Sequence, residues 1–442
     1  MNLVVLDEKL ADLEQLGFAP AVLEQIRGYV SSAAPQRLQR MSPYRMADEW
    51  QLPRNEILSA FLFGTRLGLF DLEWNVFCPS CTGVTDHVQH LSQLRPDSHC
   101  AYCDIHIDAS FDRSIEVTFK INDNVRETGA VTWYELVQHW DYIEYLGEVV
   151  VEENSTLDLP LELAQGNYYI GYPPLIVDDT PAAGPQVFEI AWDGESWSRS
   201  NREVYHPGPC VLHAMNKTDN PATLSYMRRK SHPWTSAADI VSLQDFRDLF
   251  STELISPDET FSIRDMVIAF TDIKGSTALY ERLGDADAYA LVKEHFRILT
   301  DVVRKHNGAV VKTIGDAVMA TFRVSTDAIQ ALLAMQQAFE DFNVQEKIPE
   351  GHIIIKVGGH RGACIAVNSN DRLDYFGRTV NIAARVQGLS TGRDIMLTRS
   401  FFDEPSVAEI VAGSHWKMRY FSAELRGIES EYDLVHLTQS GA

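Results

Sequence analysis

The sequence lacks any apolar run that approaches the roughly 20 uninterrupted residues a membrane-spanning helix needs. It is also poor in basic residues, because 38 Lys and Arg stand against 62 Asp and Glu and leave a formal net charge of -24. That charge repels polyphosphates at long range. We therefore expect no membrane span and no nucleic-acid partner, and any phosphate ligand must be held by local features.

We expect no secretory leader, because the first residues have no basic stretch, apolar core and small-residue cleavage site. Hydrophobic residues make up 45% and charged residues 23%, the balance of a soluble globular protein. We expect a cytoplasmic protein. At 442 residues the chain exceeds what one hydrophobic core usually supports, so several domains are expected.

Residues 1–74 are predicted to be helical. Pro53 can occupy the first position of a helix, and the apolar residues after it recur at helical spacing: Ile57, Leu58, Phe61 and Leu62. Short helices of this kind form either a winged-helix-like bundle or a scaffold packed on its neighbour. The absence of a basic recognition face favours the scaffold.

Cysteine is scarce, yet four of the 6 cysteines form two close pairs. Two thiolates on each of two knuckles can enclose a structural Zn²⁺, and four protein ligands leave no open position for catalysis. The spacing therefore predicts a zinc-ribbon-like module over residues 75–110, with reversible disulfides as an alternative that a cytosolic setting disfavours. The zinc ligands would be Cys78, Cys81, Cys100 and Cys103. Nearby histidines that could substitute for them are His87, His90, His99 and His106.

Residues 111–235 show the period of two that is typical of strands. Apolar side chains alternate with polar ones from Ile115 to Ile121, and again from Phe188 to Trp192 before an Asp-Gly turn. A β-rich, sandwich-like domain is predicted, and its regulator, if it has one, is unknown. Residues 236–262 are predicted to be a linker with a short amphipathic helix that joins the domains.

Residues 263–442 alternate strand and helix patterns in the order β-α-β-β-α-β. This order is the ferredoxin-like arrangement, an antiparallel sheet with helices covering one face, so the fold class is α+β. The segments are a strand over 266–270, a helix over 277–305, two strands over 310–322, a helix over 327–342 and two strands over 352–367. Because proteins with this fold have many different functions, the function must be inferred from the site residues.

Two acids stand at the ends of strands in this domain. Asp272 ends an apolar strand and precedes a turn of small residues, and Asp316 lies at the tip of a hairpin. Carboxylates on adjacent strand ends can hold Mg²⁺ ions, and backbone amides at a turn into a helix suit phosphate oxygens. Downstream, Asn381 and Arg385 are four residues apart on a predicted helix and share one face. None of these motifs alone would indicate a function.

Together these segments resemble the class III nucleotidyl cyclase family, from about Arg264 to Leu437. The resemblance implies two metal ions per active site, Mg²⁺ or Mn²⁺, bound by Asp272, Asp316 and the carbonyl of Ile273. It implies that Asn381 and Arg385 stabilise the transition state. It assigns substrate contacts to Gly275, Ser276, Thr277, Lys312, Lys356, Asp374 and Arg426.

The base can be inferred from two of these positions. Lys312 offers a donor to N1 of adenine and Asp374 accepts from its exocyclic amine, whereas guanine presents the opposite pattern. The sequence thus predicts an adenylate cyclase that converts ATP to 3′,5′-cyclic AMP and pyrophosphate in intracellular signal transduction. The alternatives are a guanylate cyclase using GTP, or a catalytically silent zinc-containing regulator that dimerises through its cyclase-like domain.

The resemblance also implies a homodimer with active sites at the interface, because the metal acids and the base-reading residues come from different protomers in this family. The helical, four-cysteine and β-rich region resembles the N-terminal region that accompanies some bacterial cyclases. That likeness implies a regulatory or scaffolding role without naming a ligand.

Overall fold

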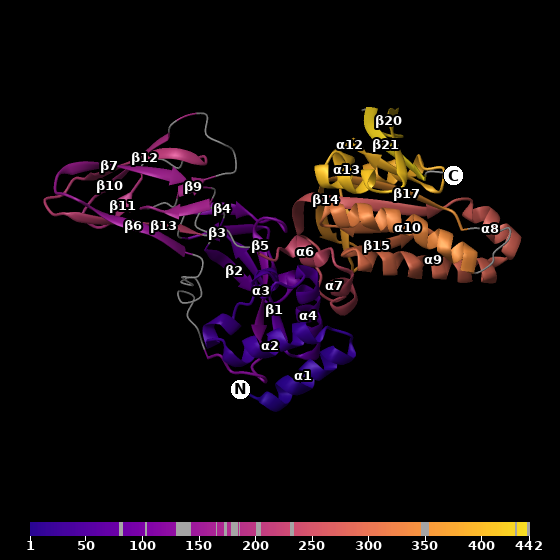
Figure 1. The fold of residues 1–442 in the computed structure, drawn as a ribbon, viewed down its shortest axis with the longest axis horizontal. Helices are drawn as coiled ribbons and strands as arrows, with labels where there is room; N and C mark the ends of the chain where they lie inside the picture. Colours follow the sequence, from indigo (N-terminus) through magenta and orange to yellow (C-terminus); the bar gives the residue numbers. More distant parts are fainter. Residues whose placement is uncertain are drawn as a thin grey trace.

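The structure is a computed structural model, shown in Figure 1. It describes residues 1–78, 83–101, 104–129, 143–164, 166–171, 175–177, 184, 186–199, 205–229, 234–345, 353–428 and 431–439. None of the helices in these ranges is long and apolar enough to cross a membrane.

The N-terminal segment is helical up to Leu67, whereas residues 70–74, which were also predicted to be helical, begin strand β1. Its helices are α1 (Leu3–Gln15), α2 (Pro20–Ser32), the 3₁₀ turn η1 (Pro35–Leu38), α3 (Pro43–Trp50) and α4 (Arg54–Leu67). Pro53 is the N-cap of α4, one position earlier than predicted, and its fixed backbone angle is compatible with that place too. The predicted apolar face of α4 is confirmed, because Ile57, Leu58, Phe61 and Leu62 are all fully buried.

The helices pack on a three-stranded antiparallel sheet of order β2-β1-β5. Its strands are β1 (Phe70–Phe77), β2 (Val84–Val88) and β5 (Ile115–Ile121). The strand predicted at 115–121 is therefore present, but it pairs with β1 and not with the later β-rich strands. Between β2 and β5 lie the turn η2 (Leu91–Gln93) and a small hairpin of β3 (Asp97–Cys100) and β4 (Ile105–Asp108).

A β-sandwich follows, with two four-stranded sheets of order β11-β10-β12-β7 and β6-β13-β8-β9. A separate apolar core between the sheets contains Phe188, Leu212 and Leu224. The strands are β6 (Ile143–Val151), β7 (Ser155–Leu163), β8 (Gly166–Tyr169), β9 (Leu175–Val177), β10 (Gln186–Trp192), β11 (Trp197–Ser198), β12 (Gly208–Asn216) and β13 (Ala222–Arg229).

Two short helices, α6 (Ala237–Val241) and α7 (Gln244–Leu249), replace the single helix predicted in the linker. We call them the connector. The C-terminal sheet has the order β15-β16-β14-β17-β19-β21-β20, with β18 paired to β17. The first part of this domain comprises β14 (Thr260–Ile273), α8 (Ser276–Leu283), α9 (Asp285–Lys305), β15 (Gly308–Ile314), β16 (Ala317–Phe322), α10 (Ser325–Gln345) and β17 (Ile355–Asn368). The remainder comprises β18 (Leu373–Phe376), α11 (Arg378–Gly388), β19 (Asp394–Thr398), α12 (Arg399–Phe402), α13 (Pro405–Ala412), β20 (Trp416–Glu424) and β21 (Glu431–Gln439).

The predicted β-α-β-β-α-β order is confirmed, with two corrections. The region predicted as two strands over 352–367 forms the single strand β17. Within the described part of the C-terminal sheet, β17 and β19 pair in parallel and the other pairs are antiparallel. The sheet is also covered on both faces. Val267 and Ala269 of β14 point into a core with α9 and α10, whereas Ile268 and Phe270 point into a second core with α11, the connector and the N-terminal helices. The second layer comes from helices that the sequence predicts, but whose packing on this sheet it does not predict.

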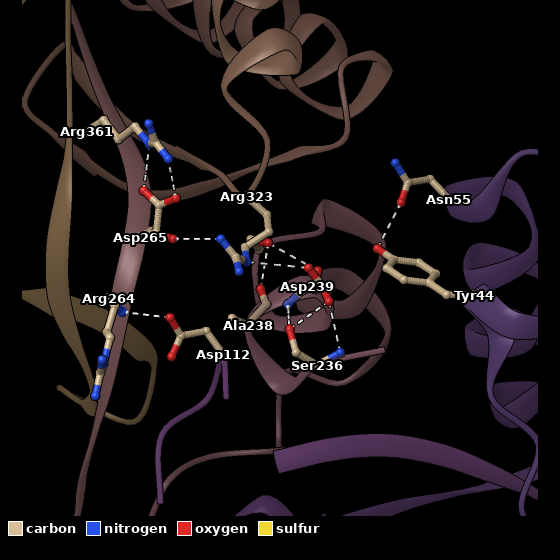
Figure 2. A network of polar contacts seen from close by, with 11 residues as sticks. Tyr44, Asn55, Asp112, Ser236, Ala238, Asp239, Arg264, Asp265, Arg323 and Arg361 are labelled. Carbon is tan, nitrogen blue, oxygen red and sulfur yellow. Dashed lines mark hydrogen bonds and ion pairs between the residues drawn. The ribbon is translucent and has the colours of Figure 1, made fainter. Parts of the chain in front are cut away.

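The connector is joined to the sheet by a chain of polar contacts, drawn in Figure 2. Arg361 of β17 makes a bidentate pair with Asp265 of β14 at 2.7 and 2.6 Å. Arg323 donates to the carbonyl of Asp265 at 3.0 Å and lies 3.5 Å from Asp239 of α6. Asp239 also accepts from the backbone N–H and the hydroxyl of Ser236. Burial raises the pKa of Asp239, and these partners compensate its charge.

The shared core predicts that the C-terminal domain does not fold well alone. A fragment that starts at Phe261 would expose apolar residues of the second face, and we expect it to aggregate on size-exclusion chromatography. Replacing 143–229 by a short Gly-Ser linker should instead give a folded chain, because Ile143 and Arg229 are paired neighbours and the sandwich has its own core. A monodisperse Phe261 fragment with a cooperative melt would contradict this prediction.

Candidate active site

Two carboxylates meet where β14 ends. Asp272 is the last but one residue of β14, and Asp316 lies in the two-residue turn between β15 and β16. The backbone N–H of Ile273 donates to Oδ2 of Asp316 at 3.2 Å, which ties the hairpin tip to the end of β14. Gly315 has φ of 64°, a backbone region that glycine adopts without the cost of a Cβ, so the turn can place Asp316 there.

The surroundings of Asp272 destabilise the charged form of its carboxyl group. Burial, followed by the charge and the hydrogen bond of Asp316, raises the pKa of Asp272 to about 6, and Lys356 opposes the shift. Lys356 is the β17 residue in register with Asp272. A divalent cation between the two carboxylates would relieve their repulsion.

The donor set fits Mg²⁺ or Mn²⁺ better than a softer metal, because both side chains are carboxylates. In the described part of the chain, no group of three or more His, Cys, Asp and Glu side chains is arranged to hold a metal. Two carboxylates alone are a common protein contribution to magnesium sites at which substrate phosphates supply the remaining ligands. The arrangement thus suits a cation that arrives with a phosphorylated substrate.

A turn of small residues leads from these acids into α8. Gly275 is the N-cap of α8 with φ of 70°, and it is exposed, as is Thr277, whereas Ser276 is half-buried. No side chain caps the helix, so the backbone N–H groups of its first turn point outward from a helix N-terminus. Such a terminus beside two acids can hold phosphate oxygens that also contact a cation.

The two residues predicted to read a base lie against one another. Nζ of Lys312 on β15 is 2.6 Å from Oδ2 of Asp374 on β18. Oδ1 of Asp374 accepts from the backbone N–H of Tyr375 at 2.8 Å, and Nζ of Lys312 lies 5.2 Å from the ring centroid of Phe376. The Asp374 side chain is 10% exposed and that of Lys312 30%, so one donor and one acceptor converge at a partly desolvated point.

Helix α11 carries Asn381 and Arg385, and both are exposed. The helix lies very close to β17, because a Cβ added to Gly358 would come within 2.3 Å of the Gln387 backbone. Gly362 allows a similar approach by Thr379, whose hydroxyl oxygen would lie 2.7 Å from such a Cβ. The glycines of β17 therefore allow α11 to pack closely on the strand.

The remaining predicted residues are less closely grouped. Arg426 is exposed after β20, and among the described residues neither it nor the side chains of Asn381 and Arg385 form a hydrogen bond or ion pair with the acids. Cys78 and Cys100 are buried in one small cluster with Ile107. The other cysteines of the predicted zinc site, Cys81 and Cys103, lie outside the described residues.

Two residues next to the site were not among the predicted site residues. Gln244 and Arg247 of α7 contact the strands that carry Lys312 and Asp374. The helical spacing of Leu243 and Phe246 does indicate that a helix is present here. The polar positions of this helix match no motif, so no local pattern distinguishes Gln244 and Arg247 from ordinary surface residues.

Residues 260–411 match the family model described as the Adenylate and Guanylate cyclase catalytic domain. We call this part of the chain the cyclase domain because of that similarity. Residues 6–160 match a second model, described as a Family of unknown function (DUF5939), which covers the N-terminal helices and the first sheet.

Curated relatives match over the cyclase domain. An adenylate cyclase from Anabaena cylindrica is 32% identical over 152 residues, which are 31% of this chain and 30% of the relative. An adenylate cyclase from Lachancea kluyveri is 34% identical over 157 residues, 31% of this chain and 8% of the relative. The chain thus spans less than a third of the length of either relative.

Solved structures also align with the cyclase domain. The adenylyl cyclase CyaB from P. aeruginosa aligns with a TM-score of 0.36 and 22% identity, covering 41% of this chain and 97% of that one. The guanylyl cyclase Cya2 aligns with a TM-score of 0.35 and 19% identity, covering 41% of this chain and 95% of that one.

Proposed function

We propose that this protein is an adenylate cyclase that converts ATP to 3′,5′-cyclic AMP and pyrophosphate. The observation that carries the proposal is the Lys312 and Asp374 pair, with its 2.6 Å contact, inside a cyclase catalytic domain. Adenine presents an acceptor at N1 beside a donor at its amine, so Lys312 and Asp374 complement it. The curated relatives named adenylate cyclase support the same base.

In the proposed reaction, the 3′-oxygen of ATP forms a bond to the α-phosphorus while the bond from that phosphorus to the bridging oxygen breaks. The 3′-hydroxyl loses its proton to solvent, and pyrophosphate leaves with the electron pair of the broken bond. Asp272 and Asp316, with the carbonyl of Ile273, would hold Mg²⁺ or Mn²⁺. A bound divalent cation lowers the pKa of the attacking hydroxyl and offsets phosphate charge.

The chain's own residues would orient the substrate around that reaction. The N–H groups of Gly275, Ser276 and Thr277 would bind the β- and γ-phosphates, with further contacts from Lys356 and Arg426. Asn381 would orient the ribose. Arg385 would neutralise the charge that develops on the α-phosphate oxygens, where a fixed guanidinium does more than water can.

The base assignment predicts a selectivity change. We expect the wild type to prefer ATP over GTP, and Lys312→Glu combined with Asp374→Cys to lower the ATP-to-GTP ratio of kcat/KM by about 100-fold, because two base contacts are mispaired. The measurement is product formation from each nucleotide with Mg²⁺ and with Mn²⁺. Lys293→Glu, at an exposed position of α9, repeats the Lys-to-Glu exchange away from the pair and should leave the ratio unaltered. A wild-type preference for GTP would refute the assignment.

We also propose that the active protein is a homodimer with two shared sites, in which the acids of one protomer face α11 and the base-reading pair of the other. The exposure of Asn381 and Arg385 supports this, because in one chain their side chains are available to a nucleotide held by a partner. A symmetric dimer places each half-site opposite its complement.

Mixing inactive variants checks the dimer proposal. Asp272→Ala and Arg385→Ala should each abolish turnover. An equal mixture should recover up to about a quarter of wild-type activity, because half of the randomly assorted dimers contain one intact site. Exchange of protomers is verified separately with differently tagged chains. Exchange without any recovery would show that the sites are not shared.

The zinc prediction is retained as a further proposal, with Cys78, Cys81, Cys100 and Cys103 as ligands. The burial of Cys78 and Cys100 in one cluster supports it. We expect one zinc per chain by mass spectrometry of the purified protein, and a loss of zinc and of thermal stability in Cys78→Ser. Cys210→Ser, in the sandwich core, should keep the metal. Folded wild-type protein without zinc would contradict the proposal.

A further inference from the structure

The short helix α7 holds the strand that carries Lys312. Oε1 of Gln244 accepts from the backbone N–H of Val310 at 2.8 Å, two residues before Lys312. The pairing of β15 with β16 shifts register between Val310 and Lys312, so this N–H lies at an irregularity of the strand. The Gln244 amide is itself oriented by a 2.8 Å bond from its Nε2 to Asp248. The conformation of β15 next to Lys312 therefore depends on α7.

The same helix holds the strand that carries Asp374. Nη1 of Arg247 donates to the carbonyl of Leu373 at 2.9 Å, one residue before Asp374. The Arg247 guanidinium also lies 5.4 Å from the ring centroid of Tyr375, one residue after Asp374. The Tyr375 hydroxyl donates to the carbonyl of Val241, the last residue of α6, at 3.1 Å. The connector thus holds β18 on both sides of Asp374.

Lys312 and Asp374 come from strands that are not hydrogen-bonded neighbours, because among the described strands β15 lies at one edge of the sheet and β18 pairs with β17 alone. Backbone pairing between β15 and β18 therefore does not fix the distance between the two side chains. Helix α7 is bonded to both strands, within two residues of each member of the pair.

We propose that α7 sets the spacing of Lys312 and Asp374, and that Gln244 and Arg247 are positioning residues for recognition of the nucleotide base. This inference rests on the proposed function, since it assigns a task to the pair that would read adenine. Neither residue touches the nucleotide. Each acts through the backbone of the strand it holds, so a small displacement of α7 alters the fit of the base.

The N-terminal region reaches the base-reading pair through this helix. The Ser59 hydroxyl of α4 donates to Asp245 at 2.7 Å, and the Trp74 ring of β1 packs edge-on against Phe246 at 6.0 Å between centroids. Just after α7, Glu253 accepts from the backbone N–H of Leu91 at 2.8 Å. A movement of the N-terminal helices or their sheet would therefore be transmitted to α7. Base affinity is the property that such a signal would change.

Arg247→Met and Gln244→Met test the proposal in the full-length chain, because methionine forms neither hydrogen bond. Methionine is nearly isosteric with glutamine, and in place of arginine it leaves a shorter, unbranched apolar side chain. The readout is the ratio of Kd values for fluorescent N-methylanthraniloyl derivatives of ATP and GTP, with kcat and KM measured in parallel. We expect each variant to lower the preference for adenine by about 3- to 10-fold, chiefly through Kd and KM. In a chain that already carries Asp374→Asn, adding Arg247→Met should not lower the preference for ATP over GTP any further.

Arg323→Met is the matched control. It removes a guanidinium from the same junction, where Arg323 makes its polar contacts with Asp265 and Asp239 (Figure 2) and not with the described residues of β15 or β18. We expect it to lower the melting temperature without altering the ATP-to-GTP ratio. The proposal is overturned if Arg247→Met and Gln244→Met leave the ratio unchanged, or if Arg323→Met alters it equally.

The binding readout separates this inference from the proposed function. Absence of cyclic nucleotide product from the wild type would refute the cyclase activity, while the ratio of binding constants would still report on α7. Conversely, a wild type that makes cyclic AMP, with a base preference that responds to Lys312 and Asp374 but not to Arg247 or Gln244, would refute the inference alone.

Discussion

The apolar face of the cyclase sheet that carries Ile268 and Phe270 needs a cover, and in this chain the N-terminal region and the connector supply it. Burial of apolar surface contributes about 25 cal/mol per Å², so a sheet face of this size cannot remain in water. Phe111 stacks on Phe261 at 4.7 Å between ring centroids, and the backbone N–H of Phe111 donates to Ser262. Because one core includes both regions, the position of the N-terminal helices and the geometry of the sheet are determined together.

Buried charge at the junction beside this shared core is compensated by polar partners. Asp239 lies in a region where an isolated carboxylate would be costly, yet Arg323 and the cap from Ser236 surround it. The bidentate pair of Arg361 with Asp265 continues the same chain of contacts into the sheet. Directional polar contacts of this type fix the orientation of two surfaces that hydrophobic burial alone would hold less specifically.

The candidate site differs from this junction, because the charges of its two carboxylates are not fully compensated. Asp272 and Asp316 repel one another, and this contributes to the raised pKa of Asp272. Sites that bind charged ligands commonly retain such unfavourable contacts, since the ligand then gains energy by relieving them. Lys312 and Asp374 satisfy each other in the free protein, so a base must replace their mutual contact with two contacts of its own.

The sequence by itself determined the order of elements in the last domain, the acid at the end of a strand, the acid in a hairpin turn and the Asn and Arg four residues apart. These are local patterns, set by side-chain period and by turn chemistry over a few residues. It also indicated a sandwich and a helical start, although it assigned the strand at 115–121 to the wrong neighbour. The strand itself follows from local alternation, whereas its partner β1 depends on contacts distant in the sequence.

Only the tertiary structure decided which surfaces meet. Gly358 and Gly362 of β17 permit the close packing of α11, and no local signal distinguishes that use of glycine from a turn. Likewise, Gln244 and Arg247 have no motif, and their importance arises from bonds to Val310 and Leu373, residues 66 and 126 positions away. Such contacts depend on the packing of whole elements, which short sequence patterns do not encode separately. The sequence therefore determined the candidate chemical groups, and the fold determined what holds them.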